Sequence, residues 1–201
     1  RTHILYLSSA DQSGHEVCTD RTDACTKFCL DKSGRGRMQS VVDGRMRKTR
    51  LYFNSPGMFK ALLNKEIHRA IANKHKRNLN LCFRLDGTSD LGLGIGFAKR
   101  HPTAQFYDYT KLLNRRSIPA NYDLTISYST AKPYDKNCIA AARSQGRRIA
   151  AVWRGTQPDF LHGFPTVSGD DHDLRFLDPL DSCCALTAKG RARKQDSALI
   201  V

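Results

Sequence analysis

The sequence predicts an α/β fold with a mainly parallel sheet of about five to six strands. The first observation is that, in the second half of the chain, short apolar runs alternate with helical or loop segments. The second is that 201 residues with 40% hydrophobic content are enough for one sizeable domain with its own core. The strands are too few for a closed eight-stranded barrel, so we expect an open sheet or a partial (β/α) barrel.

The domain organisation follows from the same reading. We find no repeat and no clear linker, so residues 1–190 are expected to form a single α/β domain. Residues 191–201 read as a basic tail and are expected to be flexible.

The first elements alternate in type. Residues 3–9 have the alternation of a strand. Residues 18–29 follow as an irregular loop that contains three cysteines. Residues 39–53 then predict a helix, or two short pieces separated at Gly44.

Residues 55–76 give the clearest helical pattern. Ser55 can cap the N-terminus, and Pro56 suits the first helical position. Apolar residues then recur at helical spacing and predict the buried face: Phe59, Leu62, Leu63, Ile67 and Ile71.

The remaining chain predicts further strands and one short helix. The strands are expected over residues 79–87, 105–111, 122–129, 148–155, 164–168 and 183–190. The helix covers residues 138–146, and the glycine-rich residues 90–97 are expected to be a flexible loop.

The chain is strongly basic. It has 33 Lys and Arg against 19 Asp and Glu, a net charge of +14, which attracts polyanions such as nucleic acid. The densest stretch holds six basic residues and one acid, Asp43, and these six are predicted to contact a phosphate backbone: Arg35, Arg37, Arg45, Arg47, Lys48 and Arg50. The alternative is that they form a solvated helix face.

Three cysteines lie close together in "CTDRTDACTKFC", at positions 18, 25 and 29. Three thiolates can hold three irons of a four-iron cluster and leave one iron open for a substrate, and we favour this iron–sulfur reading. They can also bind zinc with His15 as the fourth ligand, or bind no metal at all. The other four cysteines are expected to be small core residues: Cys82, Cys138, Cys183 and Cys184.

Polar side chains follow several of the predicted strands. In parallel α/β sheets the chemistry lies at the carboxyl ends of the strands. The catalytic candidates at these ends are Asp86, Ser89, Asp90, Lys111, Asp170 and Asp173. The carboxylates could act as bases or metal ligands and Lys111 could hold a phosphate, but turns use the same residue types.

Several ordered motifs resemble the phage gene product 88 family. They are "FRLDGTSDLG", "FYDYTK", "PANYDLTISYS", "GDDHDLRFLDP" and "ALTAKGRA", and the resemblance extends from about Leu5 to Arg193. It implies a protein of a bacteriophage or related mobile element and implies no particular activity. More remotely, the layout is similar to phage radical-SAM-like partial barrels, in which a three-cysteine loop follows the first strand. The cysteine spacing differs from the usual radical-SAM loop, so S-adenosylmethionine is the less expected cofactor.

The compartment is expected to be the cytoplasm of the bacterial host. The chain shows no signal peptide and no apolar run of about 18 residues that could span a membrane. Seven cysteines, an odd number, favour a reducing compartment.

Two functions fit these observations. The first is a phage or mobile-element protein with a Cys-ligated metal that acts on nucleic acid or on a phosphorylated substrate. The second is a non-enzymatic, basic nucleic-acid-binding protein with a structural zinc. The sequence does not decide whether the protein is an enzyme.

Overall fold

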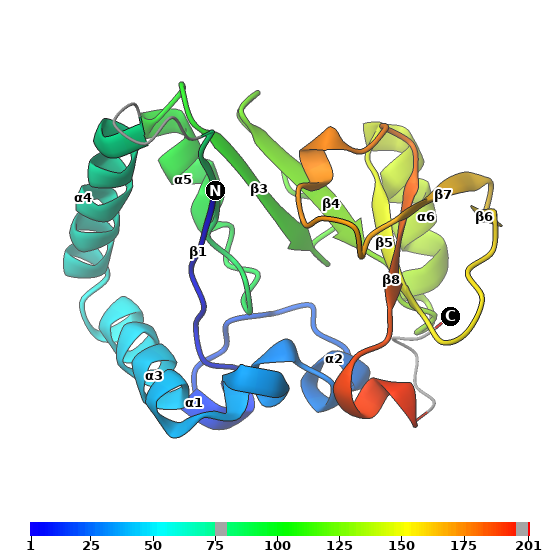
Figure 1. Ribbon diagram of the computed structural model, residues 1–201, viewed down its shortest axis with the longest axis horizontal. Coiled ribbons are helices and arrows are strands. Elements are labelled where there is room, and N and C mark those ends of the chain that lie inside the picture. Colours follow the sequence, from blue (N-terminus) through cyan, green and yellow to red (C-terminus); the bar gives the residue numbers. More distant parts are fainter. Residues whose placement is uncertain (75–79, 196–200) are drawn as a thin grey trace. The chain divides into compact units, whose positions relative to one another are not determined.

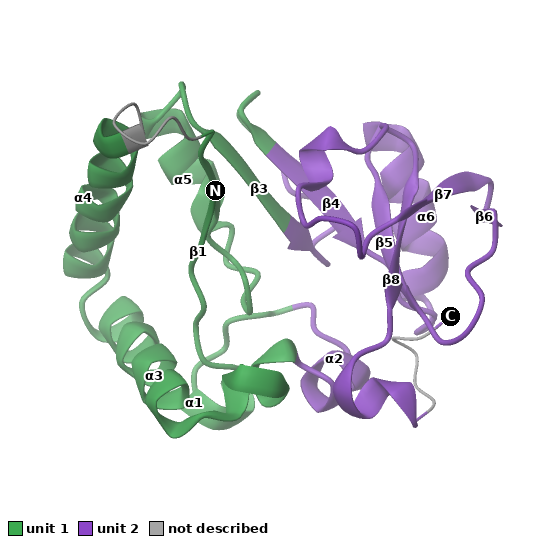
Figure 2. Cartoon of the chain, viewed as in Figure 1, with its two compact units in different colours: residues 1–19, 30–108, 117–122 green, residues 20–29, 109–116, 123–201 purple. Residues whose placement is uncertain are grey.

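The computed structural model describes residues 1–74, 80–195 and 201 (Figure 1). The chain divides into two compact units, coloured separately in Figure 2. Unit 1 comprises residues 1–19, 30–108 and 117–122, and unit 2 comprises residues 20–29, 109–116 and 123–201. The expectation of a single domain over residues 1–190 stays a prediction.

Unit 1 contains the first strands of the sheet. They are β1 (Thr2–Ile4), β2 (Cys82–Arg84) and β3 (Gln105–Thr110), although Tyr109 and Thr110 belong to unit 2. The pairs β1–β2 and β2–β3 are both parallel.

Unit 2 contains the other strands, in the order β4-β5-β8-β7-β6. They are β4 (Tyr122–Ser127), β5 (Ile149–Trp153), β6 (Phe160–Leu161), β7 (Phe164–Ser168) and β8 (Cys183–Thr187), although Tyr122 belongs to unit 1. All neighbours pair in parallel except β6 and β7, which form a short antiparallel pair.

The α/β class with a mainly parallel sheet is therefore confirmed. The described residues form more strands than the predicted five to six, because short elements such as β6 also pair. Two residues are too few for a period to be recognised in the sequence.

The helices lie between these strands in the sequence. The α-helices are α1 (Ala10–Ser13), α2 (Asp23–Lys27), α3 (Gln39–Asn54), α4 (Pro56–Lys74), α5 (Leu93–Arg100) and α6 (Tyr134–Gln145). Short 3-10 helices are η1 (Leu30–Lys32), η2 (Gly34–Arg37), η4 (Arg175–Leu177) and η5 (Gly190–Arg193). Among the described helices, none has both the length and the apolar composition needed to cross a bilayer.

The helix α3 continues through Gly44, so the single-helix alternative is confirmed. α4 begins at Pro56 as predicted, and the carbonyl oxygen of Ser55 accepts a hydrogen bond from the N–H of Phe59. The predicted end of this helix at residues 75 and 76 lies outside the described residues, as do the start of the strand predicted from residue 79 and residues 196–200 of the tail. The part of the tail at 191–193 belongs to η5.

Two expected loops are wrong. Residues 23–27 of the cysteine segment form α2, because the side chain of Thr22 accepts a hydrogen bond from the N–H of Cys25 and caps the helix. The glycine-rich segment contains α5, which begins after Gly92, a residue with φ of 72°. Glycines lower helix propensity, and for that reason the sequence pattern did not predict this helix. Its Leu93, Phe97 and Ala98 are buried.

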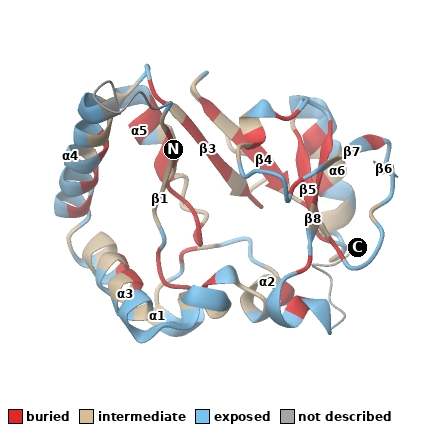
Figure 3. Cartoon of the chain, in the orientation of Figure 1, coloured by how far each residue is buried: buried red, intermediate tan, exposed pale blue. Residues whose placement is uncertain are grey.

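Each unit has its own buried residues, which are coloured red in Figure 3. In unit 1, α4 buries Phe59, Leu63 and Ile67, but Leu62 is exposed, so the buried face is narrower than predicted. In unit 2, β5 and β8 are buried along most of their length, and Cys138 and Cys183 lie in the core. Cys82 and Cys184 are also buried, so the expectation of four core cysteines is confirmed.

Candidate functional site

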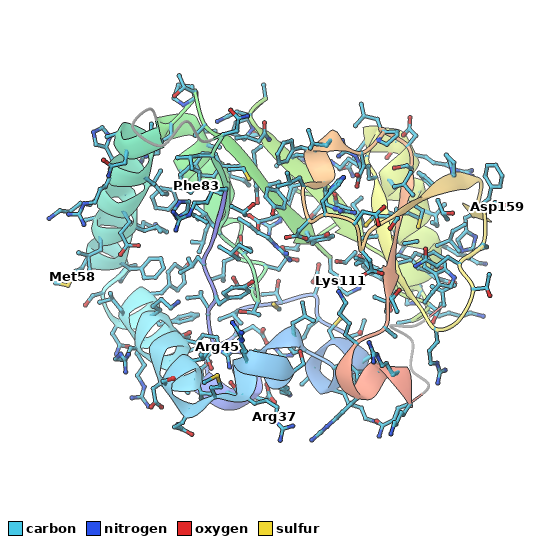
Figure 4. All side chains as sticks on the ribbon, viewed as in Figure 1. Arg37, Arg45, Met58, Phe83, Lys111 and Asp159 are labelled. Carbon is cyan, nitrogen blue, oxygen red and sulfur yellow. The ribbon has the colours of Figure 1, made fainter. Side chains whose placement is uncertain are left out.

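Arginines are exposed on two contacting elements of unit 1, η2 and α3. Arg35 and Arg37 lie on η2, and Arg47 and Arg50 lie on α3. Figure 4 shows Arg37 on the outer side of the ribbon. Four of the six predicted phosphate contacts are therefore accessible to a large polyanion.

Arg45 has a different position from these four. It is 4% exposed, and its Nη2 donates hydrogen bonds to the carbonyl oxygens of Asp31 at 3.1 Å and Gly36 at 2.7 Å. The guanidinium thus ties η1 and η2 to α3. A Cβ at position 36 would lie 2.7 Å from the carbonyl oxygen of Asp31, so this close approach requires glycine.

Lys48 is half-buried on α3. Burial lowers the pKa of its ammonium group, and the charge of Arg45 lowers it further. Arg45 and Lys48 therefore belong to the inward side of α3, and a phosphate could reach the four exposed arginines first.

The predicted metal ligands are divided between the units. His15 and Cys18 belong to unit 1, and Cys25 and Cys29 belong to unit 2. The ring of His15 stacks on Phe53 with centroids 4.3 Å apart. The Sγ of Cys18 lies 3.9 Å from the carbonyl oxygen of Thr88.

Cys25 and Cys29 lie on α2 and just after it, four residues apart in the sequence. The hydroxyl of Thr22 donates a hydrogen bond to the Sγ of Cys25 at 3.2 Å. Cys18, Cys25 and Cys29 are all partly exposed, in contrast to the four core cysteines. Over residues 1–74, 80–195 and 201, no three His, Cys, Asp or Glu side chains are grouped so that they could hold a metal ion.

Asp86 and Ser89 are brought together after β2. The buried carboxylate of Asp86 accepts hydrogen bonds at Oδ1 from the hydroxyl of Ser89 at 2.6 Å and from the N–H of Leu91 at 3.1 Å. Its Oδ2 accepts from the N–H of Leu93 at 2.9 Å, at the start of α5. Asp90 is partly exposed, and its N–H donates to the carbonyl oxygen of Val17. Asp86 thus shapes the turn into α5.

Sequence reasoning missed Asp108 as a partner of this group. Its Oδ1 accepts a hydrogen bond from the N–H of Asp86 at 2.9 Å, and its Oδ2 accepts from the N–H of Leu85 and the hydroxyl of Tyr122. Burial raises the pKa of both carboxyl groups, and the charge of Asp86 raises that of Asp108 further. The available signal was an acid inside an apolar strand, since parallel strands are often covered on both faces.

Tyr52 of α3 extends this buried acidic group. Burial raises the pKa of its hydroxyl, and the negative charge of Asp86 adds to that shift. Near the end of β2, charge and hydrogen bonding therefore link the carboxyl groups of Asp86 and Asp108 to the hydroxyl groups of two tyrosines of unit 1, Tyr52 and Tyr122.

The predicted residues of unit 2 have separate partners. The Nζ of Lys111 donates hydrogen bonds to the carbonyl oxygens of Ser127 at 3.0 Å and Tyr128 at 3.5 Å, and it lies 4.6 Å from the ring centre of Tyr134. Lys111 is 8% exposed, so its ammonium group is held by backbone dipoles and an aromatic face.

Asp170 and Asp173 lie after β7. Asp170 accepts hydrogen bonds from the N–H of Thr187 at 2.9 Å and pairs with the Nζ of Lys189 at 3.2 Å. The bonds from Thr187, and then Lys189, lower the pKa of the Asp170 carboxyl. Asp173 accepts a hydrogen bond from the hydroxyl of Tyr109 at 3.3 Å. These contacts are those of carboxylates that fix local structure.

A buried arginine in unit 2 was also missed. Arg175 is fully buried, pairs with Asp178 at 3.0 Å and donates hydrogen bonds to Cys184 and to the carbonyl oxygen of His172. Burial raises the pKa of the Cys184 thiol to about 11. The spacing of Arg175 and Asp178 by three residues was the signal that could have shown this pair.

Comparisons with known proteins give a family. A family model described as gene product 88 matches residues 2–201, so the family resemblance of the motifs is confirmed. No curated protein and no solved structure matches the chain.

Proposed function

The chain belongs to the gene product 88 family, and from this premise we propose that it is a nucleic-acid-binding protein of a phage or mobile element. It contacts phosphates through Arg35 and Arg37 on η2 and through Arg47 and Arg50 on α3. The protein acts in the cytoplasm of the bacterial host, where nucleic acid is accessible.

The placement of Arg35 and Arg37 supports the proposal most directly. They precede α3, whose N-terminus carries partial positive charge and whose first turn has no acidic residue. Arginines beside that end of a helix do not stabilise it. An external anion would remove this repulsion, and phosphate is one of the anions that arginine binds through paired hydrogen bonds.

The rigidity of η2 supports the same conclusion. Arg45 fixes the backbone of η2 through Gly36 and that of η1 through Asp31. A surface that is ordered before binding loses less conformational entropy on binding. The buried arginine is therefore a positioning residue for the exposed ones.

A salt titration of binding tests the proposal. The full chain is titrated into labelled DNA and RNA at several salt concentrations, and affinity should fall steeply as salt rises. The double variant R35Q/R37Q should make the slope of log affinity against log salt smaller by about two.

The matched control is Arg191→Gln, which removes an exposed arginine of η5. It should leave the slope of the wild type nearly unchanged. Binding that does not depend on salt, or equal losses in both variants, would contradict the proposed surface.

We further propose that Cys18, Cys25 and Cys29 take up a metal, with an iron–sulfur cluster favoured over zinc bound with His15, although the described residues are not grouped as a metal site in this structure. The support is that these three thiols are partly exposed, whereas the other four are buried. Partly exposed thiols are accessible to a metal from solution, whereas buried ones are not.

Metal analysis and an absorption spectrum of protein purified without oxygen test this second proposal. A four-iron cluster would give broad absorbance near about 400 nm, and zinc would give about one equivalent of a colourless metal. Cys29→Ala should lower the metal content, and the core control Cys82→Ala should keep it. S-adenosylmethionine binding is tested only on iron-loaded protein, and protein without either metal would reject the site.

An enzymatic activity on nucleic acid or a phosphorylated substrate is the alternative to simple binding. Its support is Asp86, whose buried carboxyl has a raised pKa and a hydroxyl partner in Ser89. Ser89→Ala should then abolish turnover of the nucleic acid and leave its binding intact. Retained turnover would remove these residues from the chemistry.

A further inference from the structure

Large apolar side chains are exposed beside the arginines of η2. Leu30 is 56% exposed, Met38 is 55% exposed and Val41 is 38% exposed. Leu30 begins η1, Met38 directly follows η2, and Val41 lies in the first turns of α3. Exposed single apolar residues are common, but three beside one charged segment form an unusual surface.

The packing of unit 1 places these residues in one neighbourhood. η1 contacts η2, and η2 contacts α3. Val41 and Arg45 are four residues apart on α3 and so share a helix face, and Arg45 donates its hydrogen bond to η2 at Gly36. We call Leu30, Arg35, Arg37, Met38 and Val41 the η2 surface.

We propose that the η2 surface binds unpaired nucleic acid, with the arginines on phosphates and the apolar side chains against base faces. This inference rests on the proposed function and names the form of nucleic acid that the site takes. The positive charge of the surface is complementary to the phosphate backbone. The apolar side chains can pack against the faces of bases, as apolar side chains do around an unstacked base.

The form of the nucleic acid follows from what each form exposes. In a regular duplex the base faces are stacked on one another, and an approaching protein meets phosphates, sugars and base edges. Three apolar side chains would then displace water from charged groups without compensation. In single strands, loops or ends the base faces are accessible and can cover apolar side chains. An acidic peptide would satisfy the arginines but offers no comparable flat apolar face.

The experiment compares two probes of equal length on the full chain. One is a labelled single-stranded oligonucleotide without self-complementarity, and the other is the same sequence as a blunt duplex. Wild-type protein should bind the single strand about tenfold or more tightly, as expected when bases pack on the protein.

The double variant L30S/M38S should lose at least about fivefold of its affinity for the single strand. Its affinity for the duplex and its salt slope should stay within about twofold of the wild type, because the arginines remain. Met58→Ser is the matched control, since Met58 is an exposed methionine of α4, 60% exposed, in the same unit (Figure 4). It should change neither affinity.

The outcomes separate this inference from the proposed function. Salt-dependent binding with equal affinity for both probes, or equal losses of both in L30S/M38S, would overturn the inference and leave the proposed function. Absence of binding to either probe, together with binding to polyglutamate, would assign the surface to an acidic protein and overturn both. A change of oligomeric state in L30S/M38S, measured by sedimentation, would make the surface a contact between copies and overturn the inference alone.

Discussion

Arg45 shows how one buried charge can organise an exposed surface. The Nη2 of its guanidinium donates to the carbonyl oxygens of residues 31 and 36, which belong to two consecutive short elements. Short 3-10 turns have few hydrogen bonds of their own. The conformation of η1 and η2 therefore depends on the side chain of Arg45, a residue of α3.

Replacing Arg45 with Met should destabilise the protein by about 2–4 kcal/mol, because the carbonyl oxygens of Asp31 and Gly36 would lose a charged donor. The free energy of unfolding in urea measures the loss. Arg47→Met, an exposed arginine on the same helix, should change it by less than about 0.5 kcal/mol. Equal effects of the two variants would show that Arg45 does not anchor η1 and η2.

Asp108 gives a prediction about pH. Burial, and then the charge of Asp86, hold its pKa well above the ordinary value of 3.8. The folded state therefore binds a proton more tightly than the unfolded state does. The contribution of this carboxyl to stability is greatest below the ordinary pKa and decreases as pH rises towards the raised one.

The measurement is urea unfolding at pH values from about 4 to 7. Asp108→Asn keeps an uncharged group whose amide oxygen can accept a hydrogen bond from Tyr122, so the stability of the wild type relative to this variant should fall as pH rises. Tyr122→Phe removes the donor that lowers the pKa of Asp108, so in this variant the decrease in stability should continue to higher pH than in the wild type. A relative stability that rises with pH would contradict the raised pKa.

At the scale of elements, α5 illustrates why glycine patterns mislead. Gly94 lies on the buried side of α5, and a Cβ there would lie 2.6 Å from the ring of Tyr122. Gly96 lies on the same helix, and a Cβ there would meet nothing within 4 Å. One glycine is therefore required by packing, and the other is not.

Gly94→Ala should destabilise the protein by about 1–3 kcal/mol, because the methyl group must displace the Tyr122 ring. Gly96→Ala should stabilise it by about 0.5–1 kcal/mol, because alanine favours the helix and meets no obstacle. Thermal unfolding of both variants measures the difference. The same sign for both would show that α5 does not pack on Tyr122 as described.

The amphipathic helices were the elements most readable from the sequence. Pro56 at the first position and a regular apolar spacing identified α4. α2 and α5 were not readable, because a cap from Thr22 and a carboxylate from Asp86 supply what local propensity lacks. The contact from Asp86 exists only once the turn between β2 and α5 has folded, whereas the cap from Thr22 is local to α2.

At the scale of the whole molecule, the net charge of +14 dominates. Like charges repel one another in the compact state and destabilise it, and salt screens this repulsion. The melting temperature should therefore rise between low salt and about 0.2 M sodium chloride, by about 2–4 °C for each kcal/mol recovered. A falling melting temperature would show that screened ion pairs outweigh the repulsion.

A variant with lower net charge provides the control. Lys99→Glu combined with Lys136→Glu changes two exposed side chains, one on α5 and one on α6. The melting temperature of this variant should rise less with added salt than that of the wild type. An equal gain would assign the salt effect to something other than net charge.

The sequence by itself determined the fold class, the family, the main helices and the basic character of residues 35–50. These depend on period, on motif order and on composition, which are properties of the chain before it folds. Only the tertiary structure decided which of the basic residues are accessible, because Arg45 and Arg47 have the same charge and differ in what packs over them. It also decided that Asp108 joins Asp86, since hydrogen bonds between neighbouring strands link residues distant in the sequence. The burial of a side chain and its hydrogen-bond partners arise only when the chain packs. For that reason the sequence predicted the basic segment but not which of its side chains are exposed.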